Sequence, residues 1–430
     1  MKFRNRTLIQ KMSLLFAPLA FAAFGSGAQA ADTITEALTG GKVSANLQYR
    51  YENVDQPTSG LKTAEASTFR LRLGYETAEY KGFGAMVQIE SIAGNHMYNS
   101  RSNGQTSYSV VADPRGTEIN QAYLSYTGLP QTKLKYGRQV ITYDNHRWIG
   151  NVVWRQNWQT YDAFTAVNQT LPDTTVSLAY INNVNRVFGE SSIDNGTGAF
   201  MGDHKMSSPL VNVKYSGFKL AEITGYGYFL DYDAAAKAFG RTNSTRTLGI
   251  RAKGEAPISE GGTKLLYAAE YADQSDYGDN PVNYSVHYTL AEVGVGFKAA
   301  DLPSSFKVGY ELLSSNGQQS LSTPLATLFA FNGWADVFLA TPRNGLRDIY
   351  ASARTNVYGI VLGVDYHDFQ ADFGGGDYGT EWDLMAEKQI DKTWSVGTRA
   401  AFFNTANAKN AACAACIDTD KFWLYGAMNF

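Results

Sequence analysis

The sequence predicts an all-β protein: a single transmembrane antiparallel β-barrel of about eighteen strands, with sixteen as the alternative. Three observations support this prediction. Amphipathic segments of about ten to fourteen residues repeat along the chain, long enough to cross a bilayer when tilted. The connections between these segments alternate in length. The chain is rich in aromatic residues and glycine, and its sequence after residue 30 has no apolar stretch that would form a membrane-spanning helix.

The segments alternate apolar and polar residues with the two-residue period of a strand that faces two environments. In residues 68–75, Phe69 and Leu73 share one face, whereas Arg70 and Arg72 share the other. A soluble β-sandwich would bury its apolar face in the same way but would rarely place so many charges in mid-strand. The segments start near residues 42, 67, 82, 118, 131, 157, 173, 207, 218, 243, 263, 284, 304, 347, 357, 379, 393 and 420.

The connections alternate between short and long. Short ones are residues 79–82, 127–130, 216–217 and 390–392, and long, polar or irregular ones are residues 95–117, 187–206 and 316–346. Transmembrane barrels have short periplasmic turns and long external loops, and an even strand number places both termini in the periplasm. We therefore expect residues 31–430 to form one barrel domain without a separate plug.

The composition fits such a barrel. The 430 residues include 27 Tyr, 23 Phe and 41 Gly but only 2 Cys, and the mean hydropathy is -0.28. Only alternate barrel residues meet lipid, and aromatic residues gather at the two membrane interfaces. A net charge of -3 argues against nucleic-acid binding. A soluble secreted β-protein would have a similar composition, so strand length and strand number decide between the two.

The N-terminus has the three-part pattern of a cleaved signal peptide. Lys2 and Arg4 belong to a positive region, an apolar stretch follows over residues 12–24, and Ala28-Gln29-Ala30 offers a cleavage site before Ala31. The apolar stretch is too short to span a bilayer as a helix. We expect residues 1–30 to be removed and the mature chain to start at Ala31.

The C-terminal segment resembles the last strand of outer-membrane proteins, in which a final aromatic residue is part of the assembly signal. Phe422, Leu424, Met428 and the final Phe430 share one face of this segment. The two ends together predict the bacterial outer membrane as the location, the barrel assembly machinery as a partner during biogenesis, and outer-membrane lipid and lipopolysaccharide as neighbours.

Charged residues on the predicted inner face are candidates for pore lining and selectivity. Such a wall holds water in a lumen and sets the field that a passing solute meets. The candidates are Arg50, Arg70, Arg72, Lys133, Lys135, Arg251, Arg399, Glu90, Glu270 and Glu311. The Arg70/Arg72 pair is the first choice, because a guanidinium can donate two parallel hydrogen bonds to a carboxylate or phosphate. The alternative is that these charges pair with each other and only keep the lumen solvated.

Residues 137–157 interrupt the strand period and are dense in Arg, Trp, Asn and Gln, as a folded loop or constriction would be. The run contains Gly137-Arg138-Gln139, Arg147, Ile149-Gly150 and Trp154-Arg155-Gln156, and it is followed by Tyr161-Asp162-Ala163. It resembles the strand–loop–strand pattern of the alginate-export family of outer-membrane proteins. Residues 331–336 and 341–348 resemble the late-loop pattern of the same family.

The resemblance implies a monomeric barrel of about eighteen strands whose loops fold over a charged pore. It makes Arg138, Arg147, Arg155 and Asp162 motif positions, either to brace the loop against the wall or to contact solute. The family prototype exports an anionic polysaccharide through an arginine-rich lumen. This chain is shorter than such an exporter and its predicted lumen is more mixed in charge, so the resemblance supports a channel more than it supports alginate as the substrate.

The two cysteines, Cys413 and Cys416, lie in the predicted last external loop. In an exported protein this spacing predicts a disulfide that stiffens the loop tip. A thioredoxin-like redox site would need a different fold, and covalent haem attachment would need a histidine where Ile417 stands. We therefore expect no cofactor.

The five histidines lack metal-ligand spacing, so we expect no metal site and interpret them as surface or loop residues; they are His96, His146, His204, His287 and His367. No nucleophile elbow, phosphate-binding glycine loop or dinucleotide motif is present in the sequence. We therefore expect no catalytic residues. An enzyme would need a Ser or Asp close to a His at one rim of the barrel.

The sequence thus predicts a porin-like channel for passive diffusion of small hydrophilic, including anionic, solutes. Three alternatives stay open: a dedicated exporter of an anionic polysaccharide such as alginate, a barrel enzyme, and a structural sheath around an electron carrier. A strongly basic lumen would favour the exporter, and a wide empty lumen would favour the sheath.

Overall fold

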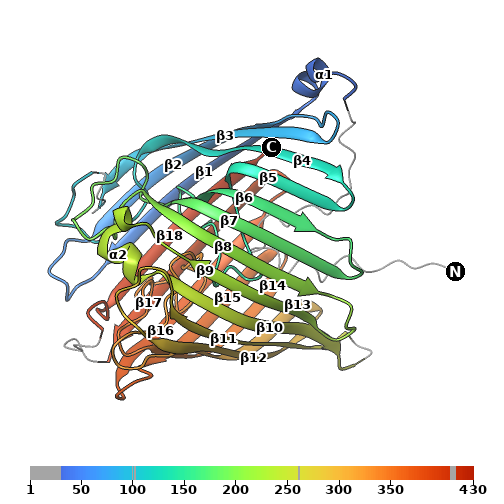
Figure 1. Ribbon diagram of the computed structural model, residues 1–430. Coiled ribbons are helices and arrows are strands. Elements are labelled where there is room, and N and C mark those ends of the chain that lie inside the picture. The colour runs from blue at the N-terminus through green and yellow to red at the C-terminus, as the bar shows by residue number, and fades with distance from the viewer. Residues whose placement is uncertain (1–30, 99, 101–102, 260–261, 407–412) are drawn as a thin grey trace.

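The computed structural model describes residues 31–98, 100, 103–259, 262–406 and 413–430, so the expected signal peptide lies outside the described residues. The described chain forms one closed antiparallel sheet of 18 strands, in which each strand pairs with its sequence neighbours and β1 pairs with β18 (Figure 1). The predicted strand number of eighteen is confirmed. The largest differences in position are at β8, which starts at Asp203 instead of 207, and at β9, which starts at Glu222 instead of 218.

The strands are β1 Lys42–Asp55, β2 Ala64–Glu76, β3 Phe83–Met97, β4 Gly116–Leu129, β5 Thr132–Gln139, β6 Thr160–Asn168, β7 Thr174–Asn185, β8 Asp203–Tyr215, β9 Glu222–Leu230, β10 Thr245–Pro257, β11 Lys264–Asp276, β12 Ser285–Ala299, β13 Leu302–Leu313, β14 Leu346–Val357, β15 Ile360–Gln370, β16 Asp377–Gln389, β17 Trp394–Thr405 and β18 Thr419–Asn429. Three short helical elements accompany them: α1 Ile34–Thr39, η1 Ala234–Ala236 and α2 Lys237–Thr242. No helix in the described part of the chain is both long and apolar enough to cross a membrane.

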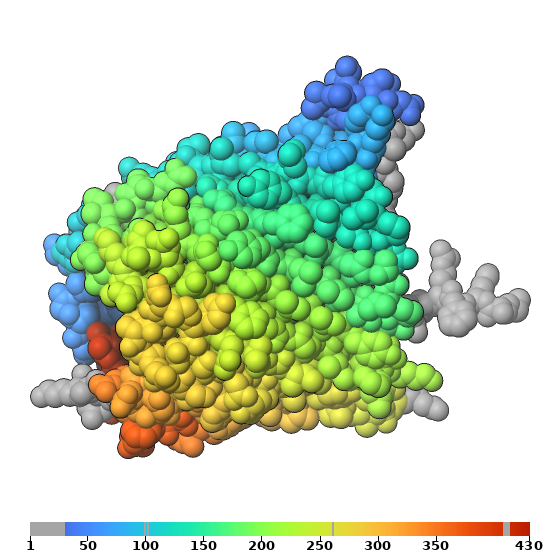
Figure 2. All heavy atoms as spheres, viewed as in Figure 1, coloured from blue at the N-terminus to red at the C-terminus, as the bar shows by residue number. Residues whose placement is uncertain are grey.

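The two faces of the wall differ as the period predicts. On β2, Phe69 and Leu73 are 44% and 47% exposed on the outer face, whereas Arg70 and Arg72 are buried inside. The same alternation continues on β16, where Trp382 and Leu384 are exposed and Asp383 is buried. Figure 2 shows one side of the closed outer surface that these strands form. The outer face is therefore apolar and the inner face polar.

The connections also separate as expected. Turns at one rim are short, as between β12 and β13 or between β14 and β15, and both described chain ends lie toward this rim. Long connections at the opposite rim include residues 98–115, 140–159 and 314–345. We call the last two the β5–β6 loop and the β13–β14 loop.

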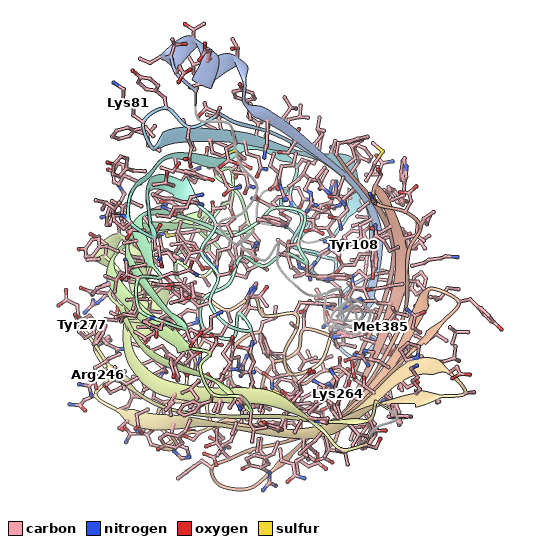
Figure 3. The ribbon with its side chains drawn as sticks, turned by 90° about the vertical axis from the view of Figure 1, so that its right-hand side faces the viewer. Lys81, Tyr108, Arg246, Lys264, Tyr277 and Met385 are labelled. Carbon is pink, nitrogen blue, oxygen red and sulfur yellow. A yellow bond between two sulfur atoms is a disulfide. The ribbon has the colours of Figure 1, made fainter. Side chains whose placement is uncertain are left out.

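The apolar core of this molecule lies inside the barrel. It is built from inward wall residues such as Tyr226 and Phe403 and from side chains of the two loops, among them Trp154 and Phe329. Figure 3, a view along the barrel from the short-turn rim, shows these loops within the ring of strands. The loops are thus part of the fold, and they position the site described below.

The apolar outer face predicts a depth-dependent effect of charge in a bilayer. Ile250 lies in the middle of β10 and Ile258 in the turn after it, and both are 57% exposed. We expect Ile250→Arg to lower the free energy of unfolding in lipid vesicles by about 2–4 kcal/mol and Ile258→Arg by about 0–1 kcal/mol, because arginine is costly only near the bilayer midplane. Urea titrations followed by tryptophan fluorescence measure both. Equal effects of the two substitutions would contradict a membrane-facing β10.

Candidate constriction and pore lining

The structure places the ten predicted lining residues on the inner face of the wall. Eight of the ten are buried, and Lys133 and Lys135 on β5 are half-buried. Burial arises because side chains of the β5–β6 and β13–β14 loops pack against the wall inside the barrel, as Trp154 does at 4.8 Å from the Arg399 guanidinium. The charged wall is therefore largely a surface on which the loops pack.

Most of the buried wall charges are paired with a carboxylate or a guanidinium. Arg72 donates from Nε to Glu90 Oε2 at 2.8 Å, and Arg251 forms an ion pair with Glu270. Arg399 donates from Nε to Glu387 Oε1 at 2.9 Å. A buried charge without such a partner would carry a large desolvation penalty. This is the pairing that the sequence left open as the alternative to a selectivity role.

The β5–β6 and β13–β14 loops contact each other across the lumen. Gly150 N donates to Leu325 O at 2.8 Å, and Thr327 N donates to His146 O at 3.0 Å. The rings of Trp154 and Phe329 stack with centroids 4.1 Å apart. The two loops therefore form one packed unit, which we call the loop pair.

Arg155 is the main ionic contact between this loop pair and the wall. Its Nη1 lies 3.1 Å from Glu52 Oε2 on β1, and its Nη2 donates to Asp336 Oδ2 of the other loop at 2.7 Å. Lys421 on β18 reaches the same Asp336 oxygen at 2.9 Å. All four side chains are buried. Arg155 thus braces the loop pair against the place where β1 and β18 close the barrel.

The connection between β3 and β4 adds a further charge to the cluster formed by Arg155, Glu52, Asp336 and Lys421. Asp113, from the loop between β3 and β4, forms an ion pair with Arg50 and accepts a hydrogen bond from Gln156 N at 2.8 Å. Burial would raise the pKa of the Asp113 carboxyl, but the charges of Arg50 and Arg155 outweigh it and hold that pKa below its ordinary value. Asp113 is therefore a charged member of the cluster.

The two arginines of β2 play different parts. The Arg72 guanidinium lies 3.5 Å from the ring centroid of Trp158 and is paired with Glu90. Arg70 forms no ion pair among the described residues; it donates to Gln156 O at 3.3 Å and to Asn46 Oδ1 at 2.6 Å. Both arginines hold the end of the β5–β6 loop, so their selectivity role stays a prediction.

The other arginine of the β5–β6 loop, Arg147, also reaches the wall. Arg147 Nε lies 2.9 Å from Glu311 Oε1, and Arg147 Nη2 donates to Asn332 Oδ1 at 3.0 Å. Asn332 in turn donates to Glu311 Oε2 at 2.7 Å. Next to Arg147, Trp148 Nε1 donates to Glu270 Oε1 at 2.7 Å. Two of the predicted lining carboxylates, Glu311 and Glu270, are therefore occupied by the loop pair.

The late-loop motif is held by its backbone. Trp334 N donates to Asp383 Oδ2 at 3.2 Å, and Ala335 N donates to Glu381 Oε1 at 2.7 Å. Gly333 has a φ of +83°, and a Cβ there would lie 2.4 Å from Glu381 Oε2. The left-handed φ and the close wall carboxylate both favour glycine at this position. The motif sequence is thus explained by docking of the loop on β16.

Arg138 and Asp162 lie on strands and outside the loop pair. Arg138 Nε donates to Asp162 Oδ1 at 2.9 Å across β5 and β6. Tyr136 and Phe164 lie two residues away on the same strands, and they are 65% and 44% exposed on the outer face. Side chains two residues apart on a strand point to the same side. These two motif positions therefore tie neighbouring strands together on the outer face.

The half of the wall near the short-turn rim carries charges that are more open to solvent. Lys133 forms no ion pair among the described residues, and Lys135 Nζ lies 4.2 Å from the ring centroid of Tyr123. On the other side of the barrel, Lys307 pairs with Glu292 at 2.7 Å and its side chain is 40% exposed. These side chains are thus less covered by the loops than the buried charges described above.

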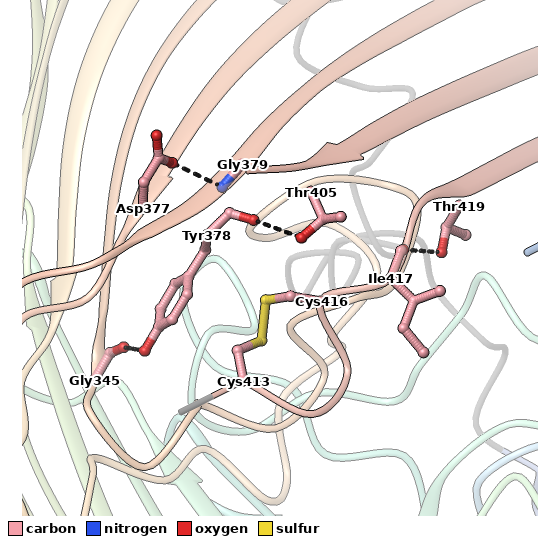
Figure 4. Close-up of a disulfide and its surroundings, with 9 residues drawn as sticks. All are labelled: Gly345, Asp377, Tyr378, Gly379, Thr405, Cys413, Cys416, Ile417 and Thr419. Atoms are coloured by element: carbon pink, nitrogen blue, oxygen red, sulfur yellow. Dashed lines mark hydrogen bonds between the residues drawn. A yellow bond between two sulfur atoms is a disulfide. The ribbon is translucent and has the colours of Figure 1, made fainter. Parts of the chain in front are cut away.

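The cysteines form a disulfide, Cys413–Cys416, in the connection between β17 and β18 (Figure 4). Both are buried and belong to the core near Tyr378, whose hydroxyl donates to Gly345 O at 3.1 Å. The predicted disulfide is therefore present, but its sulfurs pack in the core inside the barrel and not at an exposed loop tip. The bond closes a four-residue segment within the connection.

The expectation of surface or loop histidines was wrong for three of the five, because His96, His204 and His367 are buried on strands. His146 lies in the β5–β6 loop as expected, although it is buried there. His367 lies on β15 with its Nδ1 3.0 Å from Asp348 Oδ1. Among the described residues, no group of His, Cys, Asp and Glu is arranged to hold a metal ion.

Sequence reasoning missed two residues that the site depends on. Asp113 lies in a polar connection with no strand period, and Trp158 directly follows the Arg- and Trp-rich residues 137–157. No sequence pattern identifies either residue as part of the site, because each meets its arginine partner only when the loops enter the lumen. Asp336 lay within the late-loop motif but had no assigned role.

Comparisons with known proteins agree with this architecture. The sequence model described as "Alginate export" matches residues 41–332. No curated protein sequence matches the chain. Among solved structures, Acinetobacter baumannii OccAB4 has a TM-score of 0.70 at 12% identity, covering 94% of this chain and 100% of that one. Pseudomonas aeruginosa OccK5 (OpdH) has a TM-score of 0.64 at 13% identity, covering 92% and 99%. The outer membrane protein opdK from Pseudomonas aeruginosa has a TM-score of 0.66 at 12% identity, covering 91% and 99%.

In fold, the protein is thus a porin-like β-barrel with its loops packed inside. Because the family model covers well over half of the chain, the protein belongs to the alginate-export family. The predicted resemblance is confirmed. The matched region contains the whole β5–β6 motif but only Phe331 and Asn332 of the late-loop motif, so the likeness of the remainder stays a prediction.

The packing of the loop pair predicts a dependence on pH. Burial lowers the pKa of His146 from 6.5 to about 4. Between these pH values the folded protein therefore binds fewer protons at His146 than the unfolded chain does. The contribution of neutral His146 to the free energy of unfolding is fully present above about pH 6.5 and is lost as the pH falls toward 4. We expect protonation of His146 to lower the free energy of unfolding of the wild type by at most about 3 kcal/mol.

The matched variant is His146→Asn, because His146 has a φ of +65° and asparagine tolerates this conformation. Urea unfolding at pH 7 and pH 5 should show a smaller loss of stability in the variant than in the wild type. The same loss in both proteins would rule out His146 as the responsible group.

Proposed function

We propose that the protein is a bacterial outer-membrane channel of the porin type, through which small hydrophilic solutes, anionic ones included, diffuse passively. The observation that carries this proposal is a closed barrel with an apolar outer face, a charged inner face and two loops folded into the lumen. Charged walls keep a passage hydrated, and inward loops narrow it and set its selectivity.

The proposed location follows from the wall. A closed barrel leaves no backbone group unsatisfied in lipid, and the exposed side chains in mid-strand are apolar, such as Ile250 and Val293. One structure with the same fold, opdK, is described as an outer membrane protein. We further propose that residues 1–30 are the export signal, that the barrel assembly machinery inserts the chain and that the barrel is monomeric among lipid and lipopolysaccharide.

The charge balance of the lumen supports a porin over a dedicated polyanion exporter. Arg50, Arg72, Arg251 and Arg399 each face a carboxylate, so the inner wall is mixed in charge. The family description favours the exporter as the second candidate function. A sheath around an electron carrier would need a wide, empty lumen, whereas the loop pair occupies this one.

We also propose that the barrel is not an enzyme. A serine–histidine contact does occur at the long-loop rim, where Ser314 Oγ lies 3.2 Å from His287 Nδ1. Ser314 is buried, however, and its Oγ accepts a hydrogen bond from His287 N at 2.7 Å. This geometry suits a link between β12 and β13 better than a nucleophile, which must be accessible to its substrate.

Single-channel recording of the refolded chain 31–430 in planar bilayers tests the proposal. Stable conductance steps with a weak or moderate ion preference would support a porin. A strongly anion-shifted reversal potential in a salt gradient, together with block by added alginate, would favour the exporter. Absence of conductance from a demonstrably folded barrel would refute an open channel.

The half-exposed lysines predict a change in ion preference. In the double variant Lys133→Glu/Lys135→Glu, we expect the reversal potential to shift toward cations. Reversing two wall charges changes the energy of a nearby ion by on the order of 1 kcal/mol, or roughly fivefold in the permeability ratio. The control Lys205→Glu/Arg246→Glu makes the same change of net charge at exposed positions on the outer face of β8 and β10. A shift of equal size in the control would show that the two lysines do not line the path.

The brace at Arg155 predicts a change in conductance. Arg155→Ala removes one partner of buried Glu52, which keeps Arg50 at 3.7 Å, and one partner of Asp336, which keeps Lys421. Breaking a buried ion pair costs about 3–5 kcal/mol, and the second partners make the lower end of this range the expectation. The loop pair should then leave the wall, and single-channel conductance should rise and become noisier. Arg138→Ala is the control, because it breaks a motif ion pair on the outer face. Unchanged conductance in Arg155→Ala would mean that the loop pair does not limit the path.

A further inference from the structure

Helix α1 is a defined element at the short-turn rim. A capping box starts it: Thr33 Oγ1 accepts from Glu36 N at 3.1 Å, and Glu36 Oε2 accepts from Thr33 N at 3.2 Å. The helix is fixed to the wall through Ala78 N, which donates to Ala37 O at 3.0 Å, and through the Tyr75 hydroxyl, which donates to Leu38 O. Its position is therefore set by the outer side of β2 and the turn after it.

The apolar side of this helix is only partly covered. Ala37 is buried, whereas Ile34 and Leu38 are 62% and 58% exposed. At about 100° per residue these three side chains lie within one arc of the helix, with Thr35 and Thr39 on the opposite side. Ile34 and Leu38 thus lie beside the contact with the barrel and are exposed to the surroundings of the barrel at its short-turn rim.

The helix lies outside the ring of strands. Figure 3 shows α1 beyond the wall next to Lys81, and Figures 1 and 2 show it at the short-turn end. Ala31 N donates to Glu79 O at 2.8 Å, so the β2–β3 turn with Tyr80 and Lys81 lies beside it. A tyrosine and a lysine together are typical of the boundary between lipid and water, where the ring meets the acyl region and the ammonium meets phosphate.

Exposed apolar side chains like those of α1 also occur elsewhere along the short-turn rim. Exposed apolar residues occur in or beside most of the short turns: Phe83, Leu129, Leu171, Phe218, Leu220, Ile258, Tyr358, Ile390 and Trp394. These residues continue the apolar outer face of the strands. The surroundings of α1 are thus the same surroundings that the outer face of the barrel has.

We propose that α1 lies in the interface of the periplasmic leaflet, with Ile34 and Leu38 inserted among phospholipid acyl chains and Lys81 at the phosphates. The inference rests on the proposed membrane location of the barrel. The helix then widens the lipid contact of β1 and β2 beside the point where the barrel closes, and it fixes the depth of the short-turn rim.

Spin labels can measure this position. Single variants Ile34→Cys, Leu38→Cys and Thr35→Cys of the full mature chain are labelled and refolded into vesicles of phosphatidylethanolamine and phosphatidylglycerol. Cys413 and Cys416 are joined in a disulfide and do not react. Accessibility to oxygen, which enters lipid, is compared with accessibility to a water-soluble nickel chelate. Ile250→Cys in mid-strand is the reference for lipid.

We expect labels at positions 34 and 38 to be several-fold less accessible to the nickel chelate than the label at position 35, and to approach the reference at position 250. If positions 34 and 38 are as water-accessible as position 35 while position 250 is in lipid, the interfacial helix is wrong and the membrane barrel stands. That result would make a periplasmic protein the better occupant of this face. If position 250 is also in water, the membrane location itself is wrong.

Discussion

Closure of the sheet is the constraint on which the rest of this structure depends. Backbone N–H and C=O groups in lipid must pair within the protein, and an open sheet edge cannot satisfy this condition. The pairing of β1 with β18, from Asn46 with Asn429 to Asp55 with Asp420, removes both edges. A closed sheet of 18 strands encloses a lumen, and the charged side chains of the strands lie on its inner face because the outer face must be apolar to meet lipid.

A charged inner face then dictates how loops can fill that lumen. A loop that covers a carboxylate or a guanidinium must bring an opposite charge or a hydrogen-bond donor. Arg155 does so for Glu52, Arg147 for Glu311, and the N–H groups of Trp334 and Ala335 for Asp383 and Glu381. The family motif is therefore best understood as a set of complements to the wall. The proposed ion selectivity therefore assigns a role to the side chains that the loop pair leaves uncovered, with Lys133 and Lys135 as the first to test.

The candidate site was only partly predictable from the sequence. The two-residue period placed Arg70, Arg72, Glu90 and Glu270 on the inner face, because the side-chain direction of a strand follows from parity alone. Their partners were not predictable in this way. Arg72 meets Trp158 and Arg50 meets Asp113 through loops whose path depends on contacts far apart in the sequence. Arg138 and Asp162 were predicted from the motif to brace the loop or to contact solute, yet they lie on β5 and β6 and face outward.

The sequence by itself determined the fold class and the two faces of the wall and narrowed the strand number to eighteen or sixteen, because these depend on local periodicity and on the lengths of connections. It also determined that the chain would leave two cysteines near each other. Only the tertiary structure decided that the loops enter the lumen, that the cysteines are buried there, and that most wall charges are paired. Those outcomes depend on long-range packing and on the desolvation of charge, and neither has a period along the chain.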